Sequence, residues 1–218
     1  MNVISFSLWG SDPKYTVGAL KNIKLATMYY PKWECWFYCD VETVPTQIIE
    51  EISSNQNARV IPIEASEEND YGPHSGAFWR FYAIEDPTVK FFMSRDCDSR
   101  IGQREQISVI EWISSGKSFH VMRDHPYHGV PILAGMWGVK AEKLRNIKTL
   151  IDKYHRTEKW KEPICGVDQD FLRDYVWEMA KDDCYENDEF FAKKPFTLPR
   201  NPKHFVGQVY DANDKFLF

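Results

Sequence analysis

The chain has 218 residues, of which 43% are hydrophobic and 15% aromatic, and its formal net charge is −5 at pH 7. This composition excludes an intrinsically disordered protein, and the acidic balance argues against a general nucleic-acid binder, which carries an excess of basic residues. Five cysteines without a C-x-x-C pair argue against a structural zinc site and predict reduced thiols in the cytoplasm. No apolar run approaches the roughly 20 residues that are needed to cross a bilayer.

The first third of the chain alternates between strand and helix patterns. Short β-branched and aromatic runs predict strands at Val3–Leu8, Glu34–Cys39 and Arg59–Ile63. Apolar residues at helical spacing predict helices over Val17–Tyr30 and Pro45–Ser54, and a polar stretch predicts a loop over Ala65–His74. Strands that alternate with helices favour an α/β fold, with a parallel sheet and helices on its faces.

The rest of the chain continues this pattern and then loses it. Helical spacing predicts helices over Gly76–Ile84, Gln103–Ser115, Ala141–Tyr154 and Gln169–Lys181. Apolar runs predict strands over Val89–Met93, Ser118–Met122 and Ile132–Val139. The segment Asp182–Phe218 has little periodicity, so we expect it to pack irregularly on the body of the protein. Gly135 and Gly138, inside a strand-like run, predict a close approach by a ligand or by another stretch of backbone.

The run Val89–Arg100 joins an apolar strand to two carboxylates. Asp96 and Asp98 follow the strand directly, and in an open α/β sheet ligands bind beyond the carboxyl ends of the strands. If the backbone stays extended there, both carboxylates point to one side, where they suit Mg²⁺ or Mn²⁺ bound to phosphate oxygens. The alternative is an ordinary solvated turn or a helix N-cap.

Further motifs lie in a fixed order around this pair. Arg80 precedes Asp96 by about 16 residues in a predicted helix, and a small-residue segment, Leu133-Ala134-Gly135, follows. Asp168-Gln169-Asp170 opens a later helix, where Asp168 is alternatively a plain N-cap. His204-Phe205-Val206-Gly207 comes last.

Taken together, these motifs resemble the GT-A-fold glycosyltransferases. The sequence is most similar to the retaining group that includes glycogenin and the lipooligosaccharide galactosyltransferases, and to small viral and bacterial capsular-glycan transferases. The resemblance covers most of the chain. It implies an α/β, GT-A fold with a mixed, mainly parallel sheet flanked by helices. It also implies a single GT-A domain over 1–218, with a nucleotide-binding half at 1–100 and an acceptor-binding half at 101–218. The chain departs from the family at Ser94-Arg95, where apolar residues are usual, and it lacks the Lys-Pro-Trp that usually follows the His-x-x-Gly.

The resemblance also implies a function. It implies transfer of a sugar from a nucleotide-diphosphate donor, with a UDP-sugar favoured, to a saccharide or glycoprotein acceptor, with retention of configuration. The implied metal ligands are Asp96, Asp98 and His204, and histidine favours Mn²⁺ over Mg²⁺. The implied donor-binding residues are Leu8, Trp9, Gly10, Asp40, Arg80, Asp96, Cys97, Asp98 and Gly207. The implied catalytic residues are Asp124, Asp168, Gln169 and Asp170, with Gln169 on the β face of the sugar for retention and Asp168 or Asp170 as base for inversion.

Several alternatives remain open at this point. A metal-dependent phosphohydrolase or nucleotidyltransferase would use the same carboxylate pair, with Glu105 as the nearest additional ligand. A non-catalytic module would bind the nucleotide sugar without turnover. His125 and His128 suit either a zinc site or a loop that lines the acceptor pocket. Trp9, Trp79 and Trp137 fit the core better than a sugar-stacking surface.

Overall fold

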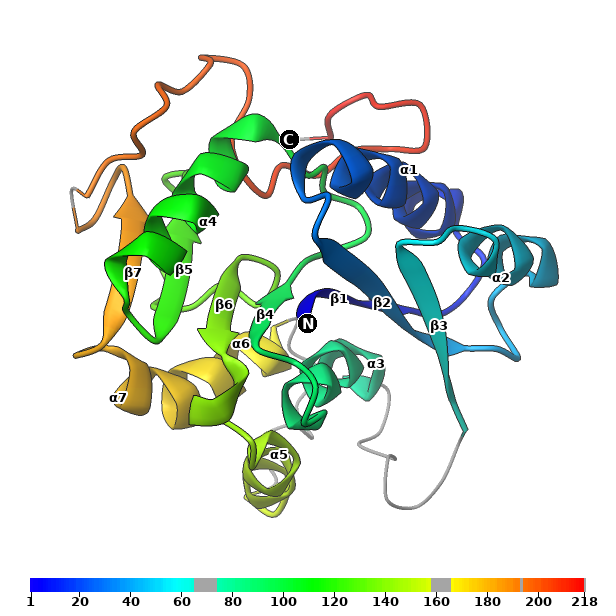
Figure 1. Ribbon diagram of the computed structural model, residues 1–218, viewed down its shortest axis with the longest axis horizontal. Helices are drawn as coiled ribbons and strands as arrows, with labels where there is room; N and C mark the ends of the chain where they lie inside the picture. Colours follow the sequence, from blue (N-terminus) through cyan, green and yellow to red (C-terminus); the bar gives the residue numbers. More distant parts are fainter. Residues whose placement is uncertain (65–73, 158–165, 193, 218) are drawn as a thin grey trace.

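The structure is a computed structural model that describes residues 1–64, 74–157, 166–192 and 194–217. Its centre is a seven-stranded sheet in the order β3-β2-β1-β4-β6-β5-β7 (Figure 1). The strands are β1 (Asn2–Leu8), β2 (Trp33–Asp40), β3 (Ala58–Ile63), β4 (Phe91–Ser94), β5 (Phe119–Arg123), β6 (Trp137–Lys140) and β7 (Cys184–Asp188). All pairings are parallel except those of β6, which runs antiparallel to both β4 and β5. The expected mixed, mainly parallel sheet is confirmed.

Two layers of helices cover the two faces of this sheet. One face carries α1 (Pro13–Tyr29), α2 (Thr46–Ser53) and α4 (Gln103–Ser115) (Figure 1). The other carries α3 (Gly76–Trp79), the 3-10 helix η2 (Arg80–Glu85), α5 (Ile147–His155), α6 (Val167–Phe171) and α7 (Trp177–Ala180). None of the helices in the described ranges has the length and apolar character to span a membrane.

The alternation of side chains along β4 shows why the strands form here. Phe91 and Met93 pack into the cluster under α1, α2 and α4, whereas Phe92 packs into the cluster under α3 and α5. A strand buried on both faces must be apolar at every position, which is why the sequence pattern there is a continuous run. Cys35 and Cys39 of β2 are buried, as expected, and the four described cysteines are free thiols. Cys165 lies outside the described residues.

The expected helix boundaries hold in some places and fail in others. The helix α4 has the bounds that the sequence predicts, and α1 begins at Pro13, earlier than the expected Val17, because Asp12 caps it by accepting from the Lys14 N–H at 2.8 Å. The expected helix Ala141–Tyr154 is broken into the 3-10 turn Ala141–Lys143 and α5. Arg145 lies at the break and donates to backbone carbonyls of Ile84 and Val89 at 2.6 and 2.7 Å, which fixes the non-helical path.

Two expectations for strands and one for the late helix also need correction. The expected strand Ile132–Val139 is reduced to β6, because the chain turns at Leu133, which accepts from the Met136 N–H at 3.0 Å. The segment after Asp182, expected to be irregular, contains β7, a polar strand at the sheet edge. The late helix starts at Val167 and contains a π-helical turn, Leu172–Val176. The predicted loop Ala65–His74 lies almost wholly outside the described residues.

Candidate functional site

A pocket of about 380 Å³ opens at the carboxyl ends of β1 and β4. From β1 the chain builds β2 and β3 on one side and then returns to place β4 on the other side. The two loops that leave β1 and β4 therefore diverge, which creates the crevice where open α/β sheets bind ligands. The pocket is lined by Ser7, Leu8, Trp9, Tyr15, Ala77, Arg80, Asp96, Cys97, Asp98, Asp168 and Val209.

Arg80 is the central cation of this pocket. Its guanidinium donates to Asp96 Oδ1 from Nη1 and to Asp168 Oδ2 from Nη2, the latter at 2.7 Å. Its backbone N–H donates to Ser7 Oγ at 2.9 Å, so β1 fixes the start of η2. Asp168 lies in the first turn of α6, and its Oδ1 accepts from the Gln169 N–H at 3.0 Å. The N-cap of α6 is Gly166, with a φ of 100°, so the alternative reading of Asp168 as the cap is wrong.

Asp96 and Asp98 both line the pocket, but a turn and not an extended chain brings them there. The residues that follow β4 form a turn, in which the Ser99 N–H donates to the Asp96 carbonyl at 3.3 Å. Asp96 contacts Arg80, whereas Asp98 contacts the ammonium of Lys14 from α1 at 3.1 Å. The Asp96 side chain is 44% exposed and that of Asp98 only 12%, so solvent or a ligand reaches Asp96 more easily.

The pocket carboxylates influence one another's ionisation. Burial and the nearby charge of Asp96 raise the pKa of Asp98. Burial likewise raises the pKa of Asp168, and the charge of Arg80 offsets only part of that effect. Burial alone would lower the pKa of Arg80, but the charges of Asp96 and Asp168 outweigh it and raise the pKa. Three carboxylates around two cations leave the site short of positive charge, which favours a further cation.

Two glycines near the site have close neighbours that leave no room for a side chain. A Cβ placed on Gly135 would lie 1.8 Å from Asp96 Oδ2, so only glycine leaves room for this carboxylate. At Gly138 the close neighbour is the backbone of β4, since a Cβ would lie 2.8 Å from the Phe92 carbonyl oxygen. Gly138 therefore meets another backbone, as expected, whereas the neighbour of Gly135 is a side chain of the site.

Of the three tryptophans, only Trp9 reaches the pocket surface. Trp9 is 49% exposed, lines the pocket and packs edge-on against Trp79, with ring centroids 6.0 Å apart. Trp79 and Trp137 are buried core residues, as the sequence indicates. Trp9 instead offers an aromatic surface at the end of β1.

Three of the expected catalytic residues do not line the pocket. Asp124 is fully buried, where it accepts from Arg104 at 2.9 Å and from the Val206 N–H at 2.9 Å. Asp170 faces outward and contacts Arg173 at 2.6 Å. Gln169 is half-buried beside Gly166, next in sequence to the lining residue Asp168.

Three expected donor-binding residues also have local structural partners. Asp40 accepts from the Thr43 hydroxyl at 2.7 Å, and Gly10 donates its N–H to Thr43 Oγ1 at 2.9 Å. Thr43 thus ties the loops after β1 and β2 together. Gly207 has a φ of 84° and packs against Met136, where a Cβ would lie 1.9 Å from the sulfur. Of the residues expected to bind the donor, the pocket is lined by Leu8, Trp9, Arg80, Asp96, Cys97 and Asp98.

The expected three-residue metal site is not assembled. His204 lies in a neighbouring pocket, exposed, with Nδ1 3.3 Å from the Tyr210 hydroxyl. Among the described residues, no three His, Cys, Asp or Glu side chains gather closely enough to hold a metal ion. The pair Asp96 and Asp98 still fits a divalent cation, since such ions are often held by one or two carboxylates, with water and substrate phosphates completing the shell.

The histidines of the loop after β5 do not form a zinc site in the described part of the chain. The Nδ1 atom of His128 accepts from the Asp124 N–H at 3.1 Å, and that of His125 accepts from the Tyr127 N–H at 3.2 Å. Both rings pack on Phe205, with ring centroids 4.4 Å apart for His125 and 5.5 Å apart for His128. The two histidines therefore shape the loop.

Four residues that line the pocket were missed by the sequence prediction: Ser7, Tyr15, Ala77 and Val209. Lys14, which contacts Asp98 from the first turn of α1, was also missed. Val209 comes from the chain beyond the His-x-x-Gly motif. The pair Asp12-Pro13 is a helix-start signal that places the following residues at the first turn of α1, beside the end of β1. The unusual Arg95 points away from the pocket to a buried ion pair with Glu105 at 3.0 Å, so it leaves the pocket lining unchanged.

Comparisons with known proteins agree on the fold. The sequence matches no family model and no curated protein. Among solved structures, a glycosyltransferase involved in glycosylation of the major capsid of PBCV-1 is similar with a TM-score of 0.51 and 17% identity, over 86% of this chain and 82% of that one. The galactosyltransferase LgtC, in complex with donor and acceptor sugar analogs, is similar with a TM-score of 0.57 and 14% identity, over 85% and 73%. TarS of S. aureus, in complex with UDP, is similar with a TM-score of 0.58 and 15% identity, over 87% and 58%.

These likenesses confirm the expected architecture. The chain has the α/β, GT-A-like fold of these glycosyltransferases. At such low identity the shared property is the fold, and the reaction must be argued from the site.

Proposed function

We propose that the protein is a glycosyltransferase that moves a sugar from a UDP-sugar to a saccharide or glycoprotein acceptor. The observation that carries the proposal is the pocket at the switch point between β1 and β4, where Arg80 joins Asp96 and Asp168 and Lys14 pairs with Asp98. A nucleotide diphosphate needs this combination: cations for its phosphates and carboxylates for a divalent ion. The UDP-bound structure of TarS, which shares the fold, supports a UDP-sugar as donor.

Within the pocket, each end of the donor meets a different surface. Leu8 and Trp9 at the end of β1 provide the apolar and aromatic wall that suits the uracil base and ribose. Arg80 and Lys14 provide the positive charge for the diphosphate, which gains negative charge as it leaves. Asp168 fixes the guanidinium of Arg80 at 2.7 Å, so that the cation is oriented before the donor binds.

A divalent ion, Mg²⁺ or Mn²⁺, would be held by Asp96 and Asp98. When bound, such an ion supplies neutralisation of the charge that develops on the leaving diphosphate. Because His204 lies apart from this pair, the argument for Mn²⁺ over Mg²⁺ from a histidine ligand no longer applies. Lys14 must yield part of its contact with Asp98 when the ion binds.

We further propose that transfer proceeds with retention of configuration. An inverting enzyme needs an available carboxylate base for the acceptor hydroxyl. The three carboxylates that line the pocket are all ion-paired, Asp96 and Asp168 with Arg80 and Asp98 with Lys14. The anomeric configuration of the new glycosidic bond, read by proton NMR and compared with that of the donor, distinguishes retention from inversion.

The alternative phosphohydrolase or nucleotidyltransferase has less support. It requires additional acidic ligands near the carboxylate pair, and Glu105, the nearest in sequence, is buried in its ion pair with Arg95.

We also propose that the protein acts in the cytoplasm. The described cysteines are free thiols, which are usual in that reducing compartment.

The test is release of the nucleoside diphosphate, UDP or GDP, across a panel of UDP- and GDP-sugars, with Mn²⁺, with Mg²⁺ and with EDTA. We expect release with one donor, dependent on the divalent ion and reduced about a hundredfold in Asp98→Asn. Glu178→Gln is the matched control, since Glu178 pairs with Lys181 on the exposed surface of α7. Release that is equal in wild type and Asp98→Asn, or a protein that binds neither UDP nor a UDP-sugar, would contradict the proposal.

A further inference from the structure

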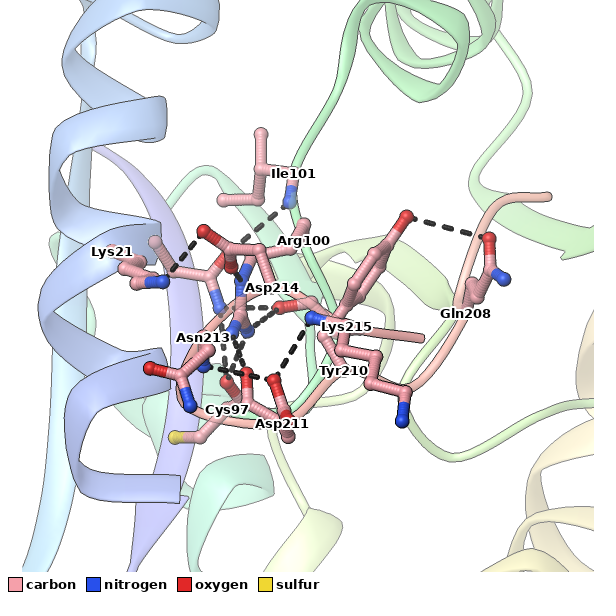
Figure 2. A network of polar contacts seen from close by, with 12 residues as sticks. Lys21, Cys97, Arg100, Ile101, Gln208, Tyr210, Asp211, Asn213, Asp214 and Lys215 are labelled. Atoms are coloured by element: carbon pink, nitrogen blue, oxygen red, sulfur yellow. Dashed lines mark hydrogen bonds and ion pairs between the residues drawn. The ribbon is translucent and has the colours of Figure 1, made fainter. Parts of the chain in front are cut away.

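The last described residues form a small hairpin, Val209–Leu217, which we call the C-terminal hairpin. Tyr210 and Phe216 form an antiparallel bridge, and the Leu217 N–H donates to the Val209 carbonyl at 3.0 Å. At its tip, Asp211 Oδ1 accepts from the N–H groups of Asn213 and Lys215, both at 2.8 Å (Figure 2). The hairpin therefore has a defined shape of its own.

This hairpin touches the pocket at two points. Val209 lines the pocket, and the Tyr210 N–H donates to the backbone carbonyl of Asp98 at 2.8 Å. That carbonyl belongs to the turn that carries both Asp96 and Asp98. The hairpin thus holds the backbone of the residue that the proposed function assigns to the metal and diphosphate.

Asp214 anchors the hairpin to the rest of the protein. Its carboxylate accepts from Arg100 Nε at 2.8 Å and from Lys21 Nζ of α1 at 2.5 Å (Figure 2). Asp214 has a φ of 62°, and among the described residues it is the one non-glycine residue with a positive φ. Such a conformation is unfavourable for most L-residues but is tolerated by Asp, so Asp suits this turn, where its carboxylate meets two cations.

Arg100 links this anchor to the turn. While Nε contacts Asp214, Nη2 donates to the Asp211 carbonyl at 3.0 Å, and Nη1 donates to the carbonyls of Ser99 at 2.8 Å and Cys97 at 3.3 Å. The Arg100 side chain, only 10% exposed, therefore joins the hairpin to the turn that carries the two carboxylates. Lysine offers no such planar fork.

The helix α1 also supports this turn. The Asn22 amide donates to the carbonyls of Ser99 at 2.9 Å and Cys97 at 3.3 Å, and its Oδ1 accepts from the Ile101 N–H at 3.1 Å. Gly18 packs against the turn, where a Cβ would lie 2.1 Å from the Cys97 carbonyl oxygen. The turn is thus fixed both by α1 and, through Arg100, by the C-terminal hairpin.

The two supports differ in strength. Asn22 is fully buried, whereas Asn213–Leu217 are exposed, and Phe216 and Leu217 remain 47% and 43% exposed. The hairpin buries little apolar surface, so its docking depends on the ion pairs of Asp214 and the hydrogen bonds of Arg100. Such contacts are weak individually and are reduced by salt.

We propose that the C-terminal hairpin is a part of the donor site, and that Asp214 is a positioning residue that acts through Arg100 to set the Asp96–Asp98 turn. This inference rests on the proposed function, because it assigns a role in donor binding at the same pocket. By linkage, if docking of the hairpin favours donor binding, then donor binding must favour docking of the hairpin by the same factor.

This reciprocity gives a direct readout. In hydrogen-exchange mass spectrometry of the full chain, addition of UDP and Mn²⁺ should slow exchange in the peptide that contains 209–217. In Asp214→Asn, exchange of that peptide without ligand should be faster than in wild type, and the Kd for UDP from calorimetry should rise about fivefold, the loss of one partly screened charged contact. Arg100→Lys should have the same effect, even if Asp214→Asn fails to fold.

Control variants separate the possible failures. Glu178→Gln should match wild type in both measurements, because its ion pair with Lys181 lies on α7. If Asp98→Asn binds UDP and Mn²⁺ as wild type does, the proposed function itself is wrong. If Asp98→Asn loses binding while Asp214→Asn and Arg100→Lys bind UDP within twofold of wild type, or if UDP leaves exchange in the hairpin unchanged, the positioning role of the hairpin is wrong.

Discussion

Replacing Arg80 by methionine tests how the central cation holds the site together. Methionine fills the space of the aliphatic stem but removes the guanidinium, so the nearly buried Asp168 loses its partner at 2.7 Å. Asp96 loses the same partner but is 44% exposed and can be hydrated instead. The main cost therefore falls on Asp168, whose pKa burial already raises.

The magnitude of this cost is bounded by protonation. Without Arg80, Asp168 can avoid an unpaired buried charge by taking up a proton, and at about pH 7 this costs a carboxyl of ordinary pKa about 4 kcal/mol. At about pH 5 the same protonation costs only about 1.5 kcal/mol. A carboxyl whose folded pKa lies above its unfolded pKa loses stability as pH rises, so the destabilisation must be larger at the higher pH.

Urea denaturation at both pH values measures this difference. The free energy of unfolding of Arg80→Met should fall below that of wild type by about 4 kcal/mol at about pH 7 and by clearly less at about pH 5. Arg145→Met is the control, because Arg145 donates to backbone carbonyls and should destabilise nearly equally at both. An equal loss at both pH values in Arg80→Met, or no loss, would refute the view of Asp168 as a buried charge balanced by Arg80.

Three other predictions concern the pocket and the core. In Gly135→Ala the new Cβ would lie 1.8 Å from Asp96 Oδ2, so this carboxylate must move. Calorimetry should then show that UDP with Mn²⁺ binds at least tenfold more weakly, and unchanged binding would refute the contact. Lys14→Met should tighten binding of Mn²⁺ alone severalfold, because the ammonium at 3.1 Å competes for Asp98, and weaker binding in a Mn²⁺ titration would contradict this competition. Burial lowers the pKa of His120 to about 3, so between about pH 6.5 and pH 3 only the unfolded chain takes up a proton on this ring, and the free energy of unfolding should decrease as the pH is lowered through that window. Urea denaturation of His120→Gln should show a smaller decrease over the same window. An unchanged pH dependence would contradict the assignment.

The sequence was informative wherever local pattern and tertiary structure agree. The apolar spacing predicted the bounds of α4, although its buried residues include Glu105 and Ser108 and Ile110 is exposed. The first three strands have strong β-branched and aromatic patterns, so their positions could be predicted. The gathering of Arg80, Asp96 and Asp168 in one pocket was expected from the ordered motifs. Gly135 was also expected to mark a close approach.

Other features depend on contacts that no local pattern encodes. The edge strand β7 is polar and half-exposed, so it lacks the apolar signal of a strand and forms because β5 offers a free edge. The family resemblance implied a catalytic role for Asp124, but Arg104, about 20 residues earlier in the sequence, pairs with this carboxylate in the interior. No local pattern showed that Asp214 is linked through Arg100 to the turn that carries Asp96 and Asp98, or that His204 lies apart from it. Both positions depend on the path of the last residues, which hydrogen bonds to Arg100 and Asp98 determine.

The most direct test of the central claim is the position of Mn²⁺ in crystals grown with UDP, read from anomalous scattering. The account predicts one strong peak beside the carboxylates of Asp96 and Asp98, with the diphosphate of UDP reaching Arg80 and the base against Trp9. A peak bound to other residues, or UDP outside the pocket between β1 and β4, would contradict it.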